Sequence, residues 1–151
     1  MFQGTVPMKS IVGKLMFILG TANFENKYPG SSNIIDRFTA DAFLEHFTKL
    51  GGAQVDTARS YGGALEVLEH ASDHSFSIGS KISSASMMNP KKLEKLIVEL
   101  DKKFSLRLSY LLLHDTIYID QIPDASISVL NQYLKTNEKL KFGVSIYFMQ
   151  E

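Results

Sequence analysis

The sequence predicts an α/β fold built on a parallel β-sheet. Short, almost continuously apolar runs alternate strictly with segments of helical periodicity. No low-complexity stretch or linker interrupts this series. The chain has 151 residues, of which 44% are hydrophobic and 21% charged, and these values suit one globular domain of ordinary size. About five strands and four helices are expected from the pattern.

The predicted strands are short segments rich in apolar residues. They cover residues 14–22, 53–57, 76–82, 108–115 and 140–148. Because apolar residues fill most of their positions instead of alternating with polar ones, these runs are typical of strands covered on both faces.

The predicted helices lie in the four intervals between these strands. They cover residues 39–52, 63–72, 89–104 and 123–139. Asn89 and Pro90 suit the N-cap and the first helical position of the third helix, and Gly51 and Gly52 suit the end of the first. The side chains expected to face the sheet are Phe43, Leu44, Phe47, Leu50, Leu65, Leu68, Ala71, Leu93, Leu96, Ile97, Leu100, Phe104, Ile127, Leu130, Tyr133 and Leu134.

Two architectures satisfy this element order: an open doubly wound sheet and a parallel (β/α) barrel of the TIM type. The loop that follows the first strand, "GTANFENKYPG", lacks the glycine pattern of a dinucleotide-binding turn, which favours the barrel. A whole barrel needs eight strand–helix units and about 250 residues. We therefore expect an incomplete barrel domain over residues 14–151, preceded by a leader or flexible N-terminus at 1–13. Its exposed sheet edges predict an oligomer or a swapped dimer.

Composition excludes several classes of function. Lys and Arg total 16, as do Asp and Glu, so the net charge of zero offers no field for nucleic acid or an anionic membrane. The chain has no cysteine, which excludes disulfides, thiol catalysis and thiolate metal sites. No metal site is expected from the sequence, and no apolar run reaches the roughly 18 residues of a membrane span. A cytoplasmic location is the expectation.

Polar side chains mark the ends of the predicted strands. They are Thr21, Asp56, Lys81, His114 and Ser145. In a parallel barrel the carboxyl ends of all strands face one mouth, where active sites of this fold are built. Asp56, Lys81 and His114 could therefore meet there, together with Tyr61 from the loop after the second strand. Singly, each has an ordinary alternative, because an Asp can cap a loop and a His after three leucines is often an interior residue.

The motifs at these strand ends resemble those of the aldo-keto reductases. "LGTANF", "DTARSYGG", "GSKI", "LLLHD" and "FGVSIY" occur in that order over essentially the whole chain from Leu15. The resemblance implies a carbonyl reductase that uses NADP(H) more readily than NAD(H). Its substrate would be a small-molecule aldehyde or ketone, including the sugar-derived carbonyls reduced by similar bacterial members.

The resemblance also implies roles for individual residues. The catalytic tetrad would be Asp56, Tyr61, Lys81 and His114. The nicotinamide cofactor would contact Gly20, Thr21, Asp56 and Ser145. The substrate would contact Phe24, Tyr28 and His114, although packing of the two loop aromatics on the barrel rim is an equal alternative for Phe24 and Tyr28.

Carbonyl reduction gives each member of this tetrad a chemical reason. A phenol has an ordinary pKa of about 10, so it transfers protons at neutral pH only if its anion is stabilised. The ammonium group of Lys81 would stabilise the phenolate of Tyr61, and Asp56 would keep Lys81 charged and in place. His114 would orient the substrate oxygen and share the proton.

The sequence also departs from the family pattern. Leu65 stands where an acidic residue is common, Glu69 where glycine is common, and Ile146 where many relatives have asparagine at a nicotinamide contact. The later strands that would hold the adenosine phosphates are not in this chain, so weak dinucleotide binding and little or no reductase activity are expected of it alone. A non-catalytic binding or regulatory module is the alternative function.

Overall fold

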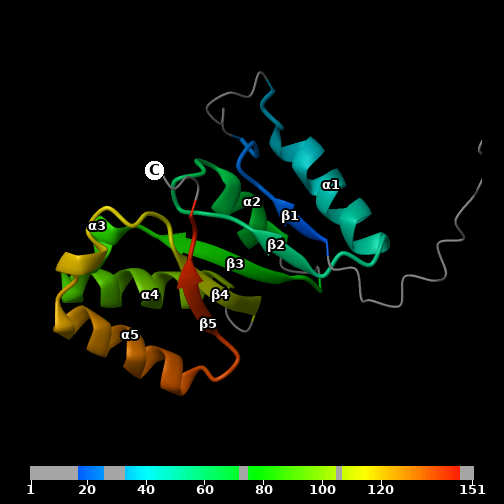
Figure 1. Cartoon of the computed structure of the whole chain (residues 1–151). Coiled ribbons are helices and arrows are strands. Elements are labelled where there is room, and N and C mark those ends of the chain that lie inside the picture. The colour runs from blue at the N-terminus through cyan, green and yellow to red at the C-terminus, as the bar shows by residue number, and fades with distance from the viewer. Residues whose placement is uncertain (1–16, 26–32, 72–74, 105–106, 147–151) are drawn as a thin grey trace, which may run out of the picture.

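Five parallel strands form a single sheet in the order in which they occur along the chain. This computed structural model describes residues 17–25, 33–71, 75–104 and 107–146, so the predicted leader at 1–13 lies outside the described residues. The strands are β1 (Ile18–Gly20), β2 (Gln54–Asp56), β3 (Ser77–Ile82), β4 (Leu108–Leu113) and β5 (Lys141–Val144), shown in Figure 1.

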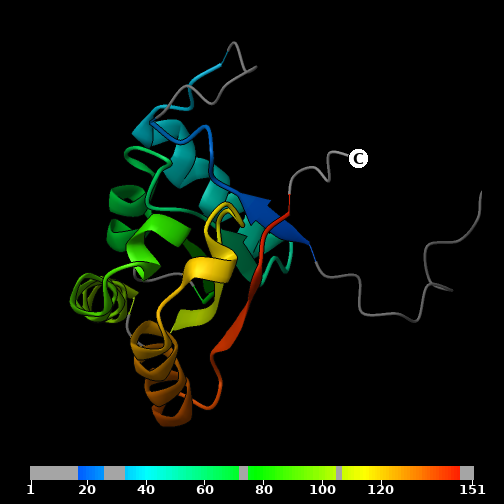
Figure 2. The same cartoon turned by 60° about the vertical axis from the view of Figure 1, so that its left-hand side comes forward.

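This strand order decides between the two predicted architectures. In a doubly wound sheet the order reverses part-way, so helices cover both faces. Here each strand lies beside its predecessor without reversal, and right-handed crossovers then place every helix on the same face. Figure 2 shows the helices gathered on one side of the sheet. The fold is therefore an incomplete parallel (β/α) barrel, as the sequence predicts.

The four predicted helices are all present. They are α1 (Arg37–Lys49), α2 (Ala64–His70), α4 (Pro90–Phe104) and α5 (Asp124–Thr136). A short additional helix, α3 (Ser84–Met87), was not predicted, because its serine-rich sequence is typical of a loop. Ser83 caps it by accepting a hydrogen bond from the Ser86 N–H at 3.2 Å. No helix among the described residues has the length and apolar character needed to cross a membrane.

Helix α4 begins where the sequence predicts. The Asn89 Oδ1 atom accepts a hydrogen bond from the Lys92 N–H at 3.1 Å, so one unpaired donor of the first turn is satisfied. We expect Asn89→Ala to lower the free energy of unfolding by about 1 kcal/mol, and Asn89→Asp to lower it by much less. Urea denaturation of the two variants measures this difference, and equal losses would contradict the capping role.

The hydrophobic core lies between the sheet and the helices. All five predicted positions of the α4 stripe are buried: Leu93, Leu96, Ile97, Leu100 and Phe104. The prediction was wrong for Phe43, Leu50 and Ile127, whose side chains are 50%, 75% and 39% exposed. Leu50 lies just beyond the last residue of α1, as its C-cap, and the strands on either side of α1 in the chain, β1 and β2, have only three residues each with which to cover the helix.

The outer strands differ from the sequence expectation. β1 and β5 are the two edges of the described sheet, and Ile18 and Val144 are 48% and 40% exposed. The prediction that strands are covered on both faces of the sheet was therefore wrong for β1 and β5. Among the described residues, no layer covers the face of the sheet that points away from the helices. The helix-facing positions of the inner strands, such as Ile78, Leu111 and Leu113, are buried as expected.

Candidate active site

The candidate site is built on one row of residues that crosses four neighbouring strands. Gly20 pairs in register with Asp56, Asp56 with Gly79, and Gly79 with Tyr110. Residues in register on parallel strands point their side chains to the same face of the sheet. Because side chains alternate along a strand, the residue two positions further on points to that face as well. Lys81 therefore stands on that face one step closer to the carboxyl ends of the strands.

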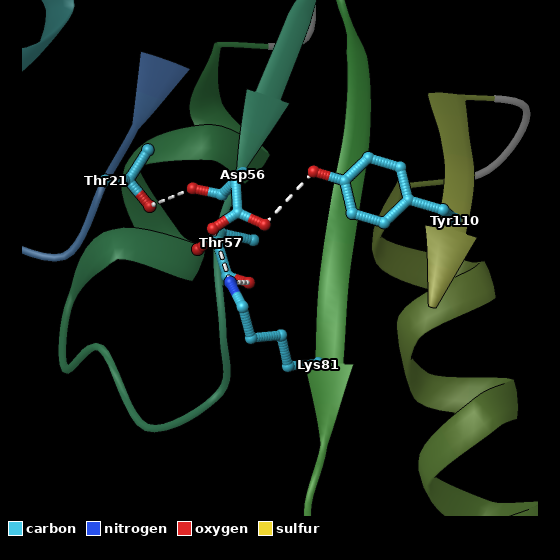
Figure 3. Close-up of polar contacts among 5 residues, drawn as sticks. All are labelled: Thr21, Asp56, Thr57, Lys81 and Tyr110. Atoms are coloured by element: carbon cyan, nitrogen blue, oxygen red, sulfur yellow. Dashed lines mark hydrogen bonds and ion pairs between the residues drawn. The ribbon is translucent and has the colours of Figure 1, made fainter. Parts of the chain in front are cut away.

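Asp56 is held through both its backbone and its side chain. Its carbonyl oxygen accepts hydrogen bonds from the Thr21 N–H at 3.0 Å and from the Thr21 hydroxyl at 3.1 Å, which tie the end of β1 to β2. Its carboxylate accepts a hydrogen bond from the Tyr110 hydroxyl at 3.0 Å through Oδ1, and it forms an ion pair with Lys81 through Oδ2. Figure 3 shows these contacts converging on Asp56.

Lys81 is a buried cation whose charge is compensated. Its side chain is 3% exposed, and its ammonium group donates to the Thr57 carbonyl oxygen at 3.2 Å as well as to Asp56. A buried ammonium group stays charged only when a counter-ion and hydrogen-bond acceptors replace its lost hydration. Asp56 and Thr57 supply both at the end of β2.

Tyr61 and His114 complete the cluster. The Lys81 ammonium nitrogen lies 5.0 Å from the centroid of the Tyr61 ring, and the Tyr61 and His114 ring centroids are 6.0 Å apart in an edge-to-face arrangement. Tyr61 is only 6% exposed. The structure thus brings together all four residues of the predicted tetrad, from β2, β3 and the loops after β2 and β4. Their catalytic roles remain predictions.

The electrostatic environment affects two of the rings. Burial lowers the pKa of His114, as does the nearby Lys81 ammonium, while the charges of Asp115 and Asp56 oppose this shift. Burial raises the pKa of Tyr110 well above its ordinary value, and the Asp56 carboxylate raises it further through its charge and its hydrogen bond. Near neutral pH the imidazole is therefore uncharged and the Tyr110 phenol stays protonated.

The lowered pKa of His114 predicts a dependence of stability on pH. Between the lowered pKa and the ordinary value of 6.5, the unfolded chain binds more protons at this residue than the folded chain. The contribution of His114 to stability should therefore be lost as pH falls below 6.5 through this window. Chemical denaturation at several pH values, compared with His114→Gln, measures the contribution, and identical pH profiles would contradict it.

The predicted contacts to the cofactor and substrate lie in different surroundings. A side-chain carbon at Gly20 would meet no heavy atom within 4 Å, so space is open beside the end of β1. Ser145 extends β5 by donating its N–H to the Leu113 carbonyl oxygen at 2.8 Å, and it is half-buried. Phe24 is 1% exposed and belongs to the core, which favours the packing alternative for this residue. Tyr28 lies outside the described residues.

Tyr110 contributes a side chain to the cluster that the sequence did not reveal. It stands inside the apolar run "LSYLLLH", where an aromatic residue is typical of strand packing. The only available signal was the phenol itself, because a Tyr inside a core usually needs a partner for its hydroxyl. No group of His, Cys, Asp or Glu within the described part of the chain is arranged to hold a metal ion.

The fold is similar to that of solved aldo-keto reductases. The structure matches the thermostable aldo-keto reductase Tm1743, solved in complex with the inhibitor epalrestat, with a TM-score of 0.63 and 21% identity, over 86% of this chain and 49% of that chain. It matches an aldo-keto reductase from Klebsiella pneumoniae, solved in complex with NADPH, with a TM-score of 0.59 and 23% identity, over 86% and 45% of the two chains.

A third similar structure is the aldo-keto reductase MGS-M4 from a Medee basin deep-sea metagenome library. Its TM-score is 0.57 at 22% identity, with 87% of this chain and 46% of that chain covered. The sequence itself matches no family model and no curated protein. The chain therefore has an aldo-keto reductase-like fold and spans about half the length of the solved reductases that it matches.

Proposed function

We propose that this chain carries the proton-transfer residues of an NAD(P)H-dependent carbonyl reductase of the aldo-keto reductase type. One observation carries the proposal: a buried ammonium group, paired with Asp56, lies 5.0 Å from the ring of a buried tyrosine. Purely structural ion pairs do not need a phenol and an imidazole beside them. The aldo-keto reductase-like fold supports the same reaction class.

In this proposal the chain's own residues deliver a proton to the carbonyl oxygen of the substrate. The Tyr61 hydroxyl donates the proton, and the Lys81 ammonium favours the phenolate that remains. Asp56 keeps Lys81 charged and in place. The uncharged imidazole of His114 orients the substrate oxygen and shares the proton. Bound nicotinamide dinucleotide would supply the hydride that the carbonyl carbon accepts.

The residues present fit the nicotinamide end of such a cofactor. The backbone at Gly20 is open, because a side-chain carbon there would meet no heavy atom within 4 Å, and the half-buried Ser145 offers a hydroxyl group just beyond β5. Thr21 would contribute through its backbone, because its hydroxyl already donates to the Asp56 carbonyl oxygen. We infer a preference for NADP(H) over NAD(H), supported by the NADPH complexes of similar structures.

The proposed substrate is a small aldehyde or ketone, including carbonyls derived from sugars. His114 would contact its oxygen, and Tyr28 is retained as a predicted contact.

We infer that residues 14–151 act as one domain. We also infer a cytoplasmic location, because a chain without cysteine needs no oxidising compartment.

The test is a carbonyl-dependent loss of the absorbance band of reduced nicotinamide. Purified chain is incubated with NADPH and a panel of small aldehydes and ketones, with a reaction lacking carbonyl as the background. We expect a slow, substrate-dependent rate and weak dinucleotide binding, because the chain spans about half the length of the similar reductases. Absence of any rate above background would favour the non-catalytic alternative, and a robust rate would contradict the weak activity expected of the chain alone.

The coverage of about half a barrel favours one alternative, a non-catalytic binding or regulatory module with the same ancestry. Such a module would bind dinucleotide or a partner without consuming NADPH. Calorimetric titration with NADPH, run beside the rate measurement, separates the two functions. Binding with no rate in any variant supports the module.

The exposed edges of the sheet lead to a prediction about association. Phe17 and Ile18 beside one edge, and Val144 and Ile146 beside the other, are each at least 40% exposed. Edge strands with apolar side chains pair readily with another chain. We expect multi-angle light scattering to find an oligomer larger than the 16.9 kDa monomer, and a stable monomer at all concentrations would contradict this expectation.

A further inference from the structure

Tyr110 reaches the candidate site from a strand that is not adjacent to Asp56. Its side chain starts on β4, crosses β3, and donates to the Asp56 carboxylate on β2 at 3.0 Å (Figure 3). Two features of β3 and β4 permit this reach. A register shift after Ile78 places Tyr110, in place of Ser109, opposite Gly79. Gly79 then leaves room for the ring, because a side-chain carbon there would collide with Tyr110.

The contact uses an oxygen of Asp56 that Lys81 does not use. The Tyr110 hydroxyl donates to Oδ1, whereas the Lys81 ammonium binds Oδ2. A carboxylate with a donor on each oxygen cannot rotate about its terminal bond without losing one contact. The raised pKa of Tyr110 keeps this phenol protonated, and so a hydrogen-bond donor, across the neutral range. The Asp56 carboxylate is therefore held in one orientation by Tyr110 at one oxygen and by Lys81 at the other.

We propose that Tyr110 is a positioning residue of this site, which fixes the Asp56 carboxylate so that Lys81 is held beside the ring of Tyr61. The effect on catalysis rests on the proposed function, whereas the effect on Lys81 does not. Tyr110 is 3.0 Å from Asp56 and has no assigned part in proton transfer, so it acts through the ion pair.

The chain offers a matched control for removing this hydroxyl. Tyr133 on α5 also donates to a carboxylate, that of Asp101, at 2.9 Å, and burial also raises its pKa. Tyr110→Phe and Tyr133→Phe therefore each remove one phenol–carboxylate hydrogen bond of the same kind while retaining the ring. Only Tyr110→Phe removes it from the candidate site.

The first measurement does not depend on activity. Reductive methylation of the folded proteins, followed by peptide mass spectrometry, gives the rate at which Lys81 is modified, with exposed Lys49 as the internal reference. We expect Tyr110→Phe to raise the Lys81 rate about tenfold, the factor that corresponds to the loss of one hydrogen bond. Tyr133→Phe should leave it at the wild-type value. Equal Lys81 rates in Tyr110→Phe and the wild type would overturn the proposal.

The second measurement is the steady-state rate of carbonyl reduction. A displaced Lys81 lowers kcat without weakening dinucleotide binding, so we expect kcat of Tyr110→Phe to fall on the order of tenfold, with KM for NADPH unchanged. Tyr133→Phe should match the wild type in both constants. If no protein shows activity while Lys81 labelling still responds to Tyr110→Phe, the proposed function fails and the positioning role stands.

A further variant tests the same role while keeping the hydroxyl. Gly79→Ala places a methyl group where the Tyr110 ring lies, so the ring must swing away from Asp56. We expect Lys81 to be labelled as fast in Gly79→Ala as in Tyr110→Phe, and no faster in the double variant. Fully additive increases in the double variant would show that the two residues act independently and would contradict the proposal.

Discussion

Replacing Tyr61 with phenylalanine should lower carbonyl reduction by at least about 100-fold, the usual contribution of a positioned proton donor. The substitution removes only the hydroxyl group. The ring remains to pack beside His114, and the Lys81 ammonium keeps its contact with the ring face. The rate of NADPH consumption with a reactive aldehyde measures the loss. Calorimetry should give the same affinity for NADPH in both proteins.

Tyr133→Phe is the control for this prediction. Tyr133 lies on α5 and donates its hydroxyl to the Asp101 carboxylate, near the start of β4 and away from the strand ends that carry the cluster. Its variant should retain the wild-type rate. Equal rates in Tyr61→Phe and the wild type would remove Tyr61 from the proposed role, whereas a loss of NADPH affinity would indicate a change in cofactor binding instead of lost proton transfer.

Replacing Lys81 with methionine should destabilise the protein by about 2 to 3 kcal/mol. The substitution leaves the Asp56 carboxylate beside buried groups without its cation. Breaking a fully buried ion pair costs about 3 to 5 kcal/mol, and the lower value here reflects the 25% exposure of the Asp56 side chain. The midpoint of thermal unfolding should fall by about 5 to 10 °C for a domain of this size. Differential scanning calorimetry measures both quantities.

A second substitution separates loss of the charge pair from loss of packing. Asp56→Asn in the Lys81→Met background removes the uncompensated charge, and its amide oxygen can still accept from Tyr110. We expect the double variant to recover much of the lost stability. Lys49→Met, which breaks the exposed pair with Glu45 on α1, should change stability little. A double variant less stable than Lys81→Met alone would contradict the account of the ion pair.

Local sequence patterns predicted most of the fold. The alternation of apolar runs and helical stripes identified the five strands of the described sheet and the four helices α1, α2, α4 and α5, and the missing dinucleotide turn favoured the barrel order that the structure has. Periodicity could not reveal how much sheet lies under each helix. For this reason Phe43 of α1 is exposed although it follows helical spacing, whereas Leu50 is exposed because the helix ends before it, at Lys49. The short helix α3 depends on a local cap at Ser83, which a serine-rich sequence also offers to turns.

The candidate site was predictable as far as strand ends determine it. Asp56, Lys81 and His114 come together because the carboxyl ends of parallel strands face one side. Tyr110 was not predictable, because its contact depends on a glycine 31 positions earlier and on a register shift between β3 and β4. The polar residues at the strand ends indicate neither the role of Gly79 nor the register shift. The pairing of residues between β3 and β4 must be known before such a contact can be inferred.

The charged groups of the site stand on strands that have neighbours on both sides. Asp56 and Lys81 belong to β2 and β3, while β1 and β5 form the rims of the described sheet. Local opening of a sheet begins at its edge strands, because each edge strand is hydrogen-bonded to a single neighbour. Amide protection against solvent exchange should therefore be deepest around this acid–base pair, which would keep its alignment while the rims open and close.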